Sequence, residues 1–461
     1  MRTRDLPAVI FREYDIRGTV GDQLTRETAH AIGSAFGRRA TGRLRRPARL
    51  AVGRDNRPSG ESLSAALIEG ALEAGATVLD VGQVPTPALY FATHTLQVDG
   101  GIQVTGSHNP PEFNGFKMVL CGEAVYGEAL QQLRRDLETS AVTVAARGSR
   151  EAVPDLLAHY RDAIVAHNAP LKRRIKVVVD CGNGVTSLVA IDALRRLGAD
   201  VVPLFAESDG RFPNHHPDPT VPENLRDLRA RVPAERAELG LAFDGDGDRL
   251  GAVDERSRII PGDLLLVLFG RDLARRLGPG HPVIFDVKCS DVLGRELERA
   301  GQKPVMWKTG HSLIKQKMKE LGAPLAGEMS GHLFFGGDWY GFDDALFAAA
   351  RLLHYLAERE GPLSRLLADV PATVSTPEIR IDCPDERKFA IVEAAATHFG
   401  AKYPVSRLDG VRITFPDGWG LLRASNTQPV LVLRFESQSE QALQSNQREV
   451  DTWLKAARVP R

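Results

Sequence analysis

Apolar and polar positions follow the same order three times along the chain. Each copy has a short apolar run, a polar loop, an amphipathic stretch, a glycine and a second apolar run, and the copies cover residues 50–81, 176–204 and 283–307. This order predicts a strand, a helix and a strand, which form a βαβ unit with a right-handed crossover in a parallel or mixed sheet. We therefore predict three α/β domains of similar build.

The pattern changes towards the C-terminus. Alternating apolar and polar residues predict half-exposed strands at 378–382 and 410–415. A polar turn between the apolar runs 420–423 and 430–434 predicts a hairpin, and helical periodicity follows at 386–398 and 440–455. These elements predict a smaller α+β domain. Polar stretches between the patterns place the domains at residues 1–150, 151–253, 254–368 and 369–461.

Composition narrows the range of partners. The formal net charge of the 461 residues is zero, which argues against nucleic acid or an anionic membrane as a bulk partner. No apolar run is long enough for a membrane span, and no signal core follows Met1. The four cysteines show no metal or redox spacing and are interpreted as buried thiols. We expect a cytoplasmic protein.

The strongest chemical signal is the sequence DGDGDR at 244–249, the metal loop. It follows an apolar strand, and its three carboxylates, Asp244, Asp246 and Asp248, are separated by glycines. Hard oxygen ligands in a tight turn suit Mg²⁺. An acidic surface turn and a Ca²⁺ loop are the alternatives, but an EF-hand needs a helix on both sides, and strands are predicted here. Arg249 is placed to help hold a phosphate.

A second polar loop has the sequence TGSHNP at 105–110, the serine loop, and follows the apolar run 101–104, predicted as a buried strand. Asn-Pro favours a turn, so Ser107 lies at a strand end, where open α/β sheets bind ligands. A simple polar turn and a Ser-His-Asp hydrolase are alternatives, although the Gly-x-Ser-x-Gly pattern is missing. Beside a metal loop, the favoured interpretation is a phosphoserine. Lys117 then balances charge or moves a proton, unless it is a surface lysine.

Two further loops carry polar side chains suited to a sugar phosphate. GEMSGH at 327–332, the sugar loop, offers Glu328 and Ser330 for sugar hydroxyls and His332 as an acid or base. RASNT at 423–427, the phosphate cradle, combines an arginine with short polar donors, and a plain hairpin turn is its alternative. Arg434 lies beyond the cradle, and Lys288 ends the first strand of the third copy.

Together these motifs resemble the α-D-phosphohexomutase superfamily, specifically its bacterial phosphomannomutase/phosphoglucomutase group. The serine, metal and sugar loops and the cradle occur in family order, after FREYDIRG at 11–18, and they span nearly the whole chain. The resemblance implies four domains around a central active-site cleft, each giving one loop. It implies a phosphoserine at Ser107, which also contacts the metal, and a Mg²⁺ site at the three aspartates.

The same resemblance implies roles for the remaining candidates. His108, Lys117, Arg249 and His332 are catalytic. The substrate-binding residues are Tyr14, Arg17, Lys288, His311, Glu328, Ser330, His332, Arg423, Ser425, Asn426, Thr427 and Arg434. The implied reaction moves a phosphate between O1 and O6 of mannose or glucose through a hexose 1,6-bisphosphate that turns round in the cleft. The implied partners are small phosphosugars, and we expect a monomer.

Three other functions are the alternatives. A phosphoglucosamine mutase shares the motifs, although the methionine at 329 resembles the mannose/glucose group. A Mg²⁺-dependent sugar-phosphate phosphatase requires that water reach the phosphoserine faster than the sugar does. A non-catalytic sugar-phosphate sensor is disfavoured because Ser107 and all three aspartates are present.

Overall fold

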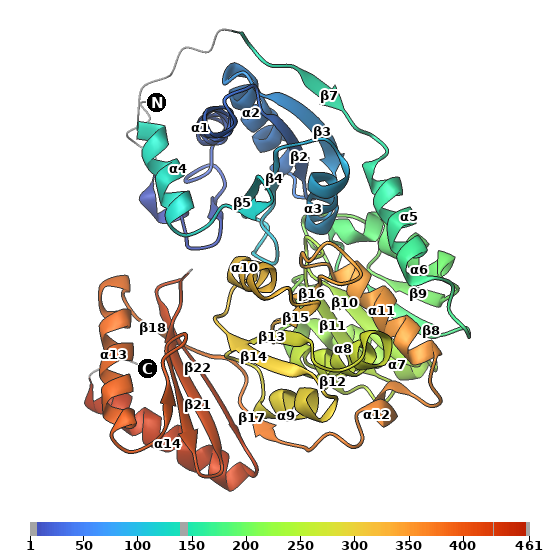
Figure 1. Cartoon of the computed structure of the whole chain (residues 1–461), viewed down its shortest axis with the longest axis vertical. Coiled ribbons are helices and arrows are strands. Elements are labelled where there is room, and N and C mark those ends of the chain that lie inside the picture. The colour runs from blue at the N-terminus through green and yellow to red at the C-terminus, as the bar shows by residue number, and fades with distance from the viewer. Residues whose placement is uncertain (1–6, 139–145, 427, 458–461) are drawn as a thin grey trace.

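The computed structural model describes residues 7–138, 146–426 and 428–457, and it has four sheets in chain order (Figure 1). The first sheet has the order β1-β5-β4-β2-β3-β7, with β6 on β5. Its strands are β1 Ile16–Thr19, β2 Arg49–Arg54, β3 Thr77–Gln83, β4 Gly100–Val104, β5 Phe113–Leu120, β6 Glu123–Ala124 and β7 Arg150–Ala152. Its helices are η2 Ala8–Ile10, α1 Arg26–Leu44, α2 Gly60–Glu73, α3 Thr86–Thr95 and α4 Glu128–Glu138.

The second sheet has the order β12-β11-β10-β8-β9, and the third has the order β14-β13-β15-β16. The second contains β8 Lys176–Asp180, β9 Asp200–Leu204, β10 Leu239–Phe243, β11 Leu250–Asp254 and β12 Ile259–Ile260. The third contains β13 Pro282–Asp286, β14 Lys303–Trp307, β15 Leu325–Gly327 and β16 Leu333–Phe335. The helices of this region are α5 Leu156–Asn168, η3 Val185–Leu188, α6 Ala190–Arg196, η4 Pro222–Leu225, α7 Arg226–Ala234, α8 Gly262–Leu277, α9 Asp291–Arg299, α10 His311–Leu321, α11 Ala345–Ala357 and α12 Leu363–Leu366.

All three predicted βαβ units are present. The pairs β2/β3, β8/β9 and β13/β14 are parallel, whereas β4/β5, β10/β11 and β15/β16 are antiparallel, so each sheet is mixed. Each amphipathic stretch forms the crossover helix, as the periodicity predicts. The three domains therefore share one α/β build, which confirms the predicted fold class.

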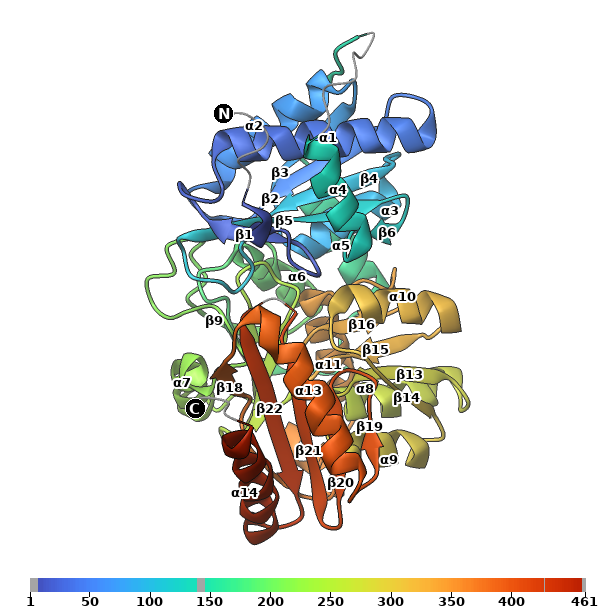
Figure 2. The same ribbon diagram turned by 90° about the vertical axis from the view of Figure 1, so that its left-hand side faces the viewer.

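The fourth sheet is antiparallel and belongs to the C-terminal domain (Figure 2). It contains β17 Val374–Ser375, β18 Ile379–Asp382, β19 Val405–Ser406, β20 Val411–Phe415, β21 Gly418–Ala424 and β22 Val430–Ser437, with helices α13 Asp385–Gly400 and α14 Glu440–Ala456. Side chains alternate along β21. Leu422 and Ala424 pack in one core with α13 and α14, while Trp419 and Leu421 pack against Val287 of the third domain.

Two expectations are wrong. β20 was expected to be half-exposed, but all of its residues except Thr414 are buried, because Arg412 stacks on Trp419 and pairs with Asp291. Cys121 was expected to be a buried thiol, but it is exposed in the turn between β5 and β6, while the other three cysteines are buried.

The apolar core has separate regions. One cluster runs from α3 of the first domain through α5 and the second and third domains. A second lies between the first sheet and helices α1, α2 and α4, and the C-terminal domain has its own cluster. Helices α1 and α2 meet backbone to backbone, because a Cβ on Gly33 would lie 1.9 Å from Leu67 O. None of the helices in the described ranges has the length and hydrophobicity needed to cross a membrane.

Candidate active site

The metal loop lies between the antiparallel strands β10 and β11. One oxygen of Asp244, Oδ1, accepts hydrogen bonds from the backbone N–H groups of Gly247, Asp248 and Arg249, at 2.9, 3.0 and 3.1 Å. Gly247 has a φ of +80°, and a Cβ there would lie 2.1 Å from Thr186 Oγ1. Only glycine fits this turn. The glycine spacing of the sequence therefore closes the loop around its first aspartate.

The three carboxylates of this loop form a buried acidic group. All three are fully buried, and they offer oxygens that lie within 4.8 Å of one another. Asp246 Oδ1 has no hydrogen-bond partner, and Asp248 Oδ1 accepts no hydrogen bond but lies 3.3 Å from His332 Nε2. Burial and the two neighbouring carboxylates raise the pKa of Asp244 well above its ordinary value. Buried hard oxygens gathered in this way fit a divalent cation.

Lys117 supplies a positive charge to this group. It lies on β5 and is buried, so the surface-lysine alternative is wrong. Its Nζ donates to Asp246 Oδ2 at 2.8 Å and to Asp248 Oδ2 at 2.5 Å. Burial alone lowers the pKa of a lysine, but these two carboxylates outweigh it and raise the pKa of Lys117 well above its ordinary value. The lysine is therefore held protonated between two loop aspartates.

The serine loop approaches the metal loop from the first domain. Ser107 is buried and has a φ of +51°, in the left-handed region that L-residues seldom adopt. Its Oγ lies 3.3 Å from Asp244 Oδ2 and 3.0 Å from His108 Nδ1. Burial and the charges of Arg249 and Arg17 lower the pKa of His108 well below its ordinary value. A neutral imidazole thus lies beside the serine hydroxyl.

The sugar loop contributes a carboxylate–histidine pair. Glu328 Oε2 lies 2.8 Å from His332 Nδ1, and Glu328 Oε1 accepts from Gly310 N at 2.7 Å. His332 Nε2 lies 3.3 Å from Asp248 Oδ1 and 3.2 Å from Arg249 Nε. Burial lowers the pKa of His332 and Asp248 raises it, with a net result of about 9. Ser330 Oγ is 3.4 Å from the same ring.

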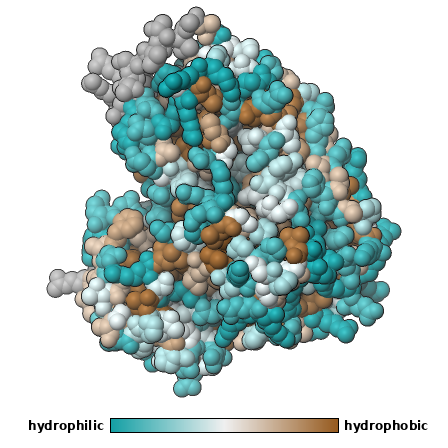
Figure 3. Space-filling model, viewed as in Figure 1, coloured by the Kyte–Doolittle hydropathy of each residue, from teal (hydrophilic) through white to brown (hydrophobic). Residues whose placement is uncertain are grey.

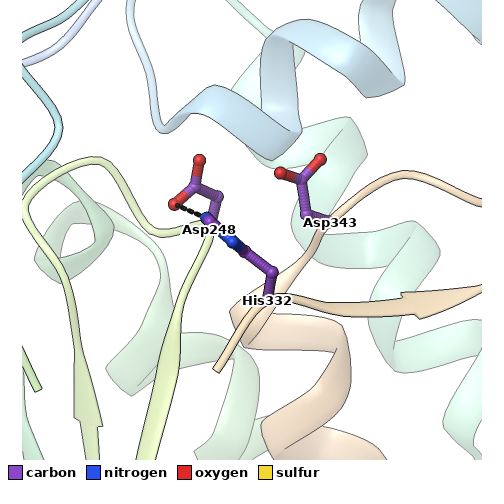
Figure 4. Close-up of side chains that lie close together, drawn as sticks. All are labelled: Asp248, His332 and Asp343. Carbon is purple, nitrogen blue, oxygen red and sulfur yellow. Dashed lines mark ion pairs between the residues drawn. The ribbon is translucent and has the colours of Figure 1, made fainter. Parts of the chain in front are cut away.

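Asp248 and His332 also lie near a further carboxylate, that of Asp343 (Figure 4). The three side chains are buried, and their ligand atoms lie within 4.8 Å of one another. Lys315 Nζ donates to Asp343 Oδ1 at 2.9 Å, so this carboxylate already has a counter-charge. His332 thus links the third domain to Asp248 of the metal loop.

Tyr14 connects the first domain to the third and C-terminal domains. Its hydroxyl donates to Thr309 O at 2.7 Å and accepts from Asn426 Nδ2 at 3.1 Å. His311 begins α10, and its ring centroid lies 6.2 Å from that of Tyr14 and 5.7 Å from that of His332. Arg17 Nε donates to both oxygens of Asp15 at 2.9 Å.

The phosphate cradle belongs to the C-terminal domain and has polar contacts of its own. Arg423 Nη2 pairs with Asp409 at 3.1 Å, and Ser425 Oγ accepts from Gln428 N at 3.1 Å. The Arg434 guanidinium lies 6.0 Å from the Trp419 ring centroid. Lys288 Nζ lies 3.4 Å from Glu378 Oε2. The remaining cradle residue, Thr427, lies outside the described residues. The space-filling view shows the surface indented between the first and C-terminal domains (Figure 3).

Three residues that the sequence did not single out hold the loops in place. Asp55 and Arg57 bind the backbone of the serine loop. Thr86 Oγ1 donates to Asp246 Oδ2 at 2.5 Å. Asp55 and Arg57 directly follow β2, the position in the first βαβ unit that corresponds to Lys288 in the third. Their place at a strand end was therefore a signal that was available in the sequence.

Comparisons with known proteins agree with this arrangement. Residues 8–141, 158–257 and 261–374 match α/β/α domains I, II and III of phosphoglucomutase/phosphomannomutase, and residues 378–452 match its C-terminal domain. The phosphomannomutase/phosphoglucomutase of Pseudomonas aeruginosa PAO1 is 51% identical over 441 residues, which cover 95% of this chain and 94% of the relative. A phosphoglucomutase of Neisseria gonorrhoeae is 46% identical over 445 residues, covering 96% and 95%.

A solved structure gives the same result in three dimensions. The phosphoglucomutase/phosphomannomutase family protein of Burkholderia thailandensis is 46% identical, superimposes with a TM-score of 0.90 and covers 98% of each chain. The four family matches lie in chain order and account for the three α/β domains and the antiparallel C-terminal domain. The chain therefore belongs to the phosphoglucomutase/phosphomannomutase family of enzymes.

Proposed function

We propose that this enzyme interconverts hexose 1-phosphate and hexose 6-phosphate, with mannose or glucose as the sugar, through a phosphoserine at Ser107. The observation that carries the proposal is the position of the Ser107 hydroxyl. It is buried, and it lies 3.3 Å from the first carboxylate of a loop in which Asp246 Oδ1 has no hydrogen-bond partner and Asp248 Oδ1 faces only His332, at 3.3 Å. A phosphoryl group on this oxygen would adjoin a ready cation site.

Asp244, Asp246 and Asp248 would hold a Mg²⁺ ion, together with an oxygen of the phosphorylated Ser107. Each offers a buried carboxylate oxygen within 4.8 Å of the others, and this arrangement fits such an ion. When bound, the ion neutralises charge on the phosphoryl group as it is transferred. The chain itself contributes two positive charges: Lys117 pairs with Asp246 and Asp248, and the charge of Arg249 acts on Asp244 and Asp248.

The transfer balances with one proton. The bond from phosphorus to Ser107 Oγ breaks while a bond forms to the free hydroxyl oxygen of the sugar, and the proton of that hydroxyl is finally taken up by Ser107 Oγ. His108, 3.0 Å from this oxygen and neutral, is the candidate that passes the proton. Lys117 and His332 are the other candidates.

The sugar bisphosphate formed in this way must turn round before the second transfer, because the single serine serves both ends of the sugar. We assign recognition of the hydroxyls to Glu328 and Ser330. The phosphate that does not react is held by the cradle residues Arg423, Ser425, Asn426 and Thr427. The residues that would line the path between the two sites are Tyr14, Arg17, Lys288, His311 and Arg434.

Intact mass and product analysis test the proposal. We expect a species heavier by about 80 Da, the mass of a phosphoryl group, in the wild type and in Ser62→Ala, an exposed serine of α2, but not in Ser107→Ala. The phosphorylated enzyme with Mg²⁺ should convert mannose 1-phosphate and glucose 1-phosphate to the 6-phosphates. Activity of Ser107→Ala equal to that of the wild type would refute the phosphoserine mechanism.

The same assay distinguishes the alternative activities. Steady release of inorganic phosphate without 6-phosphate would identify a phosphatase, and the role given to the cradle would then be withdrawn. Faster turnover of glucosamine 1-phosphate than of both other sugars would identify a phosphoglucosamine mutase. Formation of both 6-phosphates, with little free phosphate, would support a mutase of dual specificity.

A further inference from the structure

The serine loop is wrapped around one buried arginine. Arg57 follows β2, and its side chain is completely buried. A guanidinium has five N–H donors in a fixed plane, and here every one has an acceptor. Nε donates to Asp55 Oδ2 at 3.2 Å. The other four donate to backbone carbonyls, those of Pro110 (2.6 Å), Phe113 (3.0 Å), Ser107 (2.8 Å) and Asn109 (2.5 Å).

Asp55 holds the start of the same loop. Its Oδ2 accepts from Thr105 Oγ1 at 2.8 Å and from Gly106 N at 3.1 Å. The Thr105 hydroxyl in turn accepts from Ser107 N at 2.8 Å. A Cβ on Gly106 would lie 2.4 Å from Arg57 Nε, so the loop backbone lies directly against the guanidinium. Both polar groups of the Ser107 backbone are therefore fixed by this buried pair, the N–H group through Thr105.

The second domain covers the other side of the guanidinium. The ring of Phe212 lies 5.1 Å from Arg57 Cζ, in a cation–π contact. Asn56, between the two clamping residues, donates from Nδ2 to Asn183 O at 2.7 Å. Arg57 thus contacts the serine loop on one side and the domain that carries the metal loop on the other.

This arrangement explains how Ser107 keeps a left-handed backbone. A φ of +51° is unfavourable for serine, and hydrogen bonds to four inward-facing carbonyls compensate for it. With the carbonyls turned towards Arg57, the Ser107 hydroxyl lies on the side of Asp244. We propose that Arg57 is a positioning residue for phosphoryl transfer, which aligns Ser107 Oγ with the metal loop without touching the substrate. This inference rests on the mutase function proposed above.

Arg57→Lys tests the inference, because lysine keeps the charge but has three mobile donors in place of five planar ones. A misplacement of about 1 Å costs on the order of 100-fold in rate. We expect kcat to fall by about 100-fold, with KM for the hexose phosphate unchanged. The matched control is Arg351→Lys. Arg351 is also buried and pairs with an aspartate, Asp272, at 2.6 Å, but it contacts no residue of the serine loop, so its kcat should equal that of the wild type.

The measurements distinguish a wrong positioning role from a variant that does not fold and from a wrong proposed function. Wild-type kcat in a folded Arg57→Lys, a change in KM alone, or equal losses in Arg57→Lys and Arg351→Lys would overturn the positioning role. If Arg57→Lys does not fold, Phe212→Leu replaces it, since it removes only the ring beneath the guanidinium. We expect kcat about three- to tenfold lower at constant KM, and an unchanged kcat would overturn the inference. A wild type that forms no phosphoserine would instead refute the proposed function.

Discussion

Removing the hydroxyl of Thr86 tests how the first domain supports the metal loop. Thr86 begins α3 and is fully buried. Its Oγ1 donates to Asp246 Oδ2 at 2.5 Å, and its N–H donates to Asp246 O at 2.9 Å. The other donor to Asp246 Oδ2 is Lys117, at 2.8 Å, while Asp246 Oδ1 is free to bind a cation. Thr86→Val keeps the shape of the side chain and removes one of two donors that orient this carboxylate.

The magnitude follows from the kind of hydrogen bond that is lost. A hydrogen bond to a charged group contributes about 1.5–3 kcal/mol. At about 1.4 kcal/mol for each factor of ten, the Mg²⁺ affinity of Thr86→Val should be about 10- to 100-fold lower. The backbone hydrogen bond to Asp246 O remains, so the loop itself should keep its conformation.

Titration of activity with Mg²⁺ gives the half-activating concentration, and calorimetry gives the affinity directly. Thr86→Ser retains the hydroxyl and serves as the control, with an expected shift of less than about threefold, because the donor is kept. A Thr86→Val enzyme with the Mg²⁺ requirement of the wild type would refute the reasoning. So would a Thr86→Ser enzyme as impaired as the valine variant, because the hydroxyl would then not be the cause.

Three further predictions concern stability. Gly33→Ala should lower the free energy of unfolding by about 1–3 kcal/mol, because its Cβ would lie 1.9 Å from a carbonyl of α2. Gly42→Ala, in the same helix with open space around it, should raise that free energy by about 0.5–1 kcal/mol, and urea unfolding compares the two. Burial raises the pKa of Asp344 from 3.8 to about 6, so its protonation favours the folded state. When the pH is lowered from about 7 to about 5, the free energy of unfolding of the wild type should rise by about 1 kcal/mol relative to that of Asp344→Asn. Equal pH profiles of the two proteins in urea unfolding would contradict this. In EDTA, Lys117→Met should lower the free energy of unfolding by about 3–5 kcal/mol, because the buried carboxylates lose their counter-charge. Mg²⁺ should therefore raise the Tm of this variant more than that of the wild type.

Local patterns predicted the elements of the fold well. Strand β2, helix α2 and strand β3 follow one another in the predicted order, over residues 49–83 against the predicted 50–81, because periodicity depends only on neighbouring positions. The exposure of β20 could not be predicted in the same way. Its burial depends on Trp419, a residue of the next strand, and on the third domain. The alternation of Arg412 and Thr414 with apolar residues resembles that of a strand with one face in solvent.

The loops that carry chemistry were predictable, but the contacts between them were not. Glycine and proline mark the metal and serine loops as tight turns, and an apolar strand leads into each. Their contacts join side chains that are far apart in the sequence, such as Thr86 with Asp246 and Ser107 with Asp244. Arg57 binds mainly backbone carbonyls, which no sequence motif records. The sequence therefore places Arg57 just after β2 but does not mark it as a contact of the serine loop.

The separate apolar core of the C-terminal domain has a consequence for the cooperativity of unfolding. This domain buries its helices against its own sheet and meets the third domain through a small group, Val287, Trp419 and Leu421. The first domain instead packs its α3 side into the core of the second and third domains, although it has a further core of its own on the other face of its sheet. Two unfolding transitions are therefore expected on heating, one for the C-terminal domain and one for the block formed by the first three domains. A phosphosugar held by loops from both blocks would bring the transitions together, so calorimetry with and without ligand reports whether the two blocks bind it jointly.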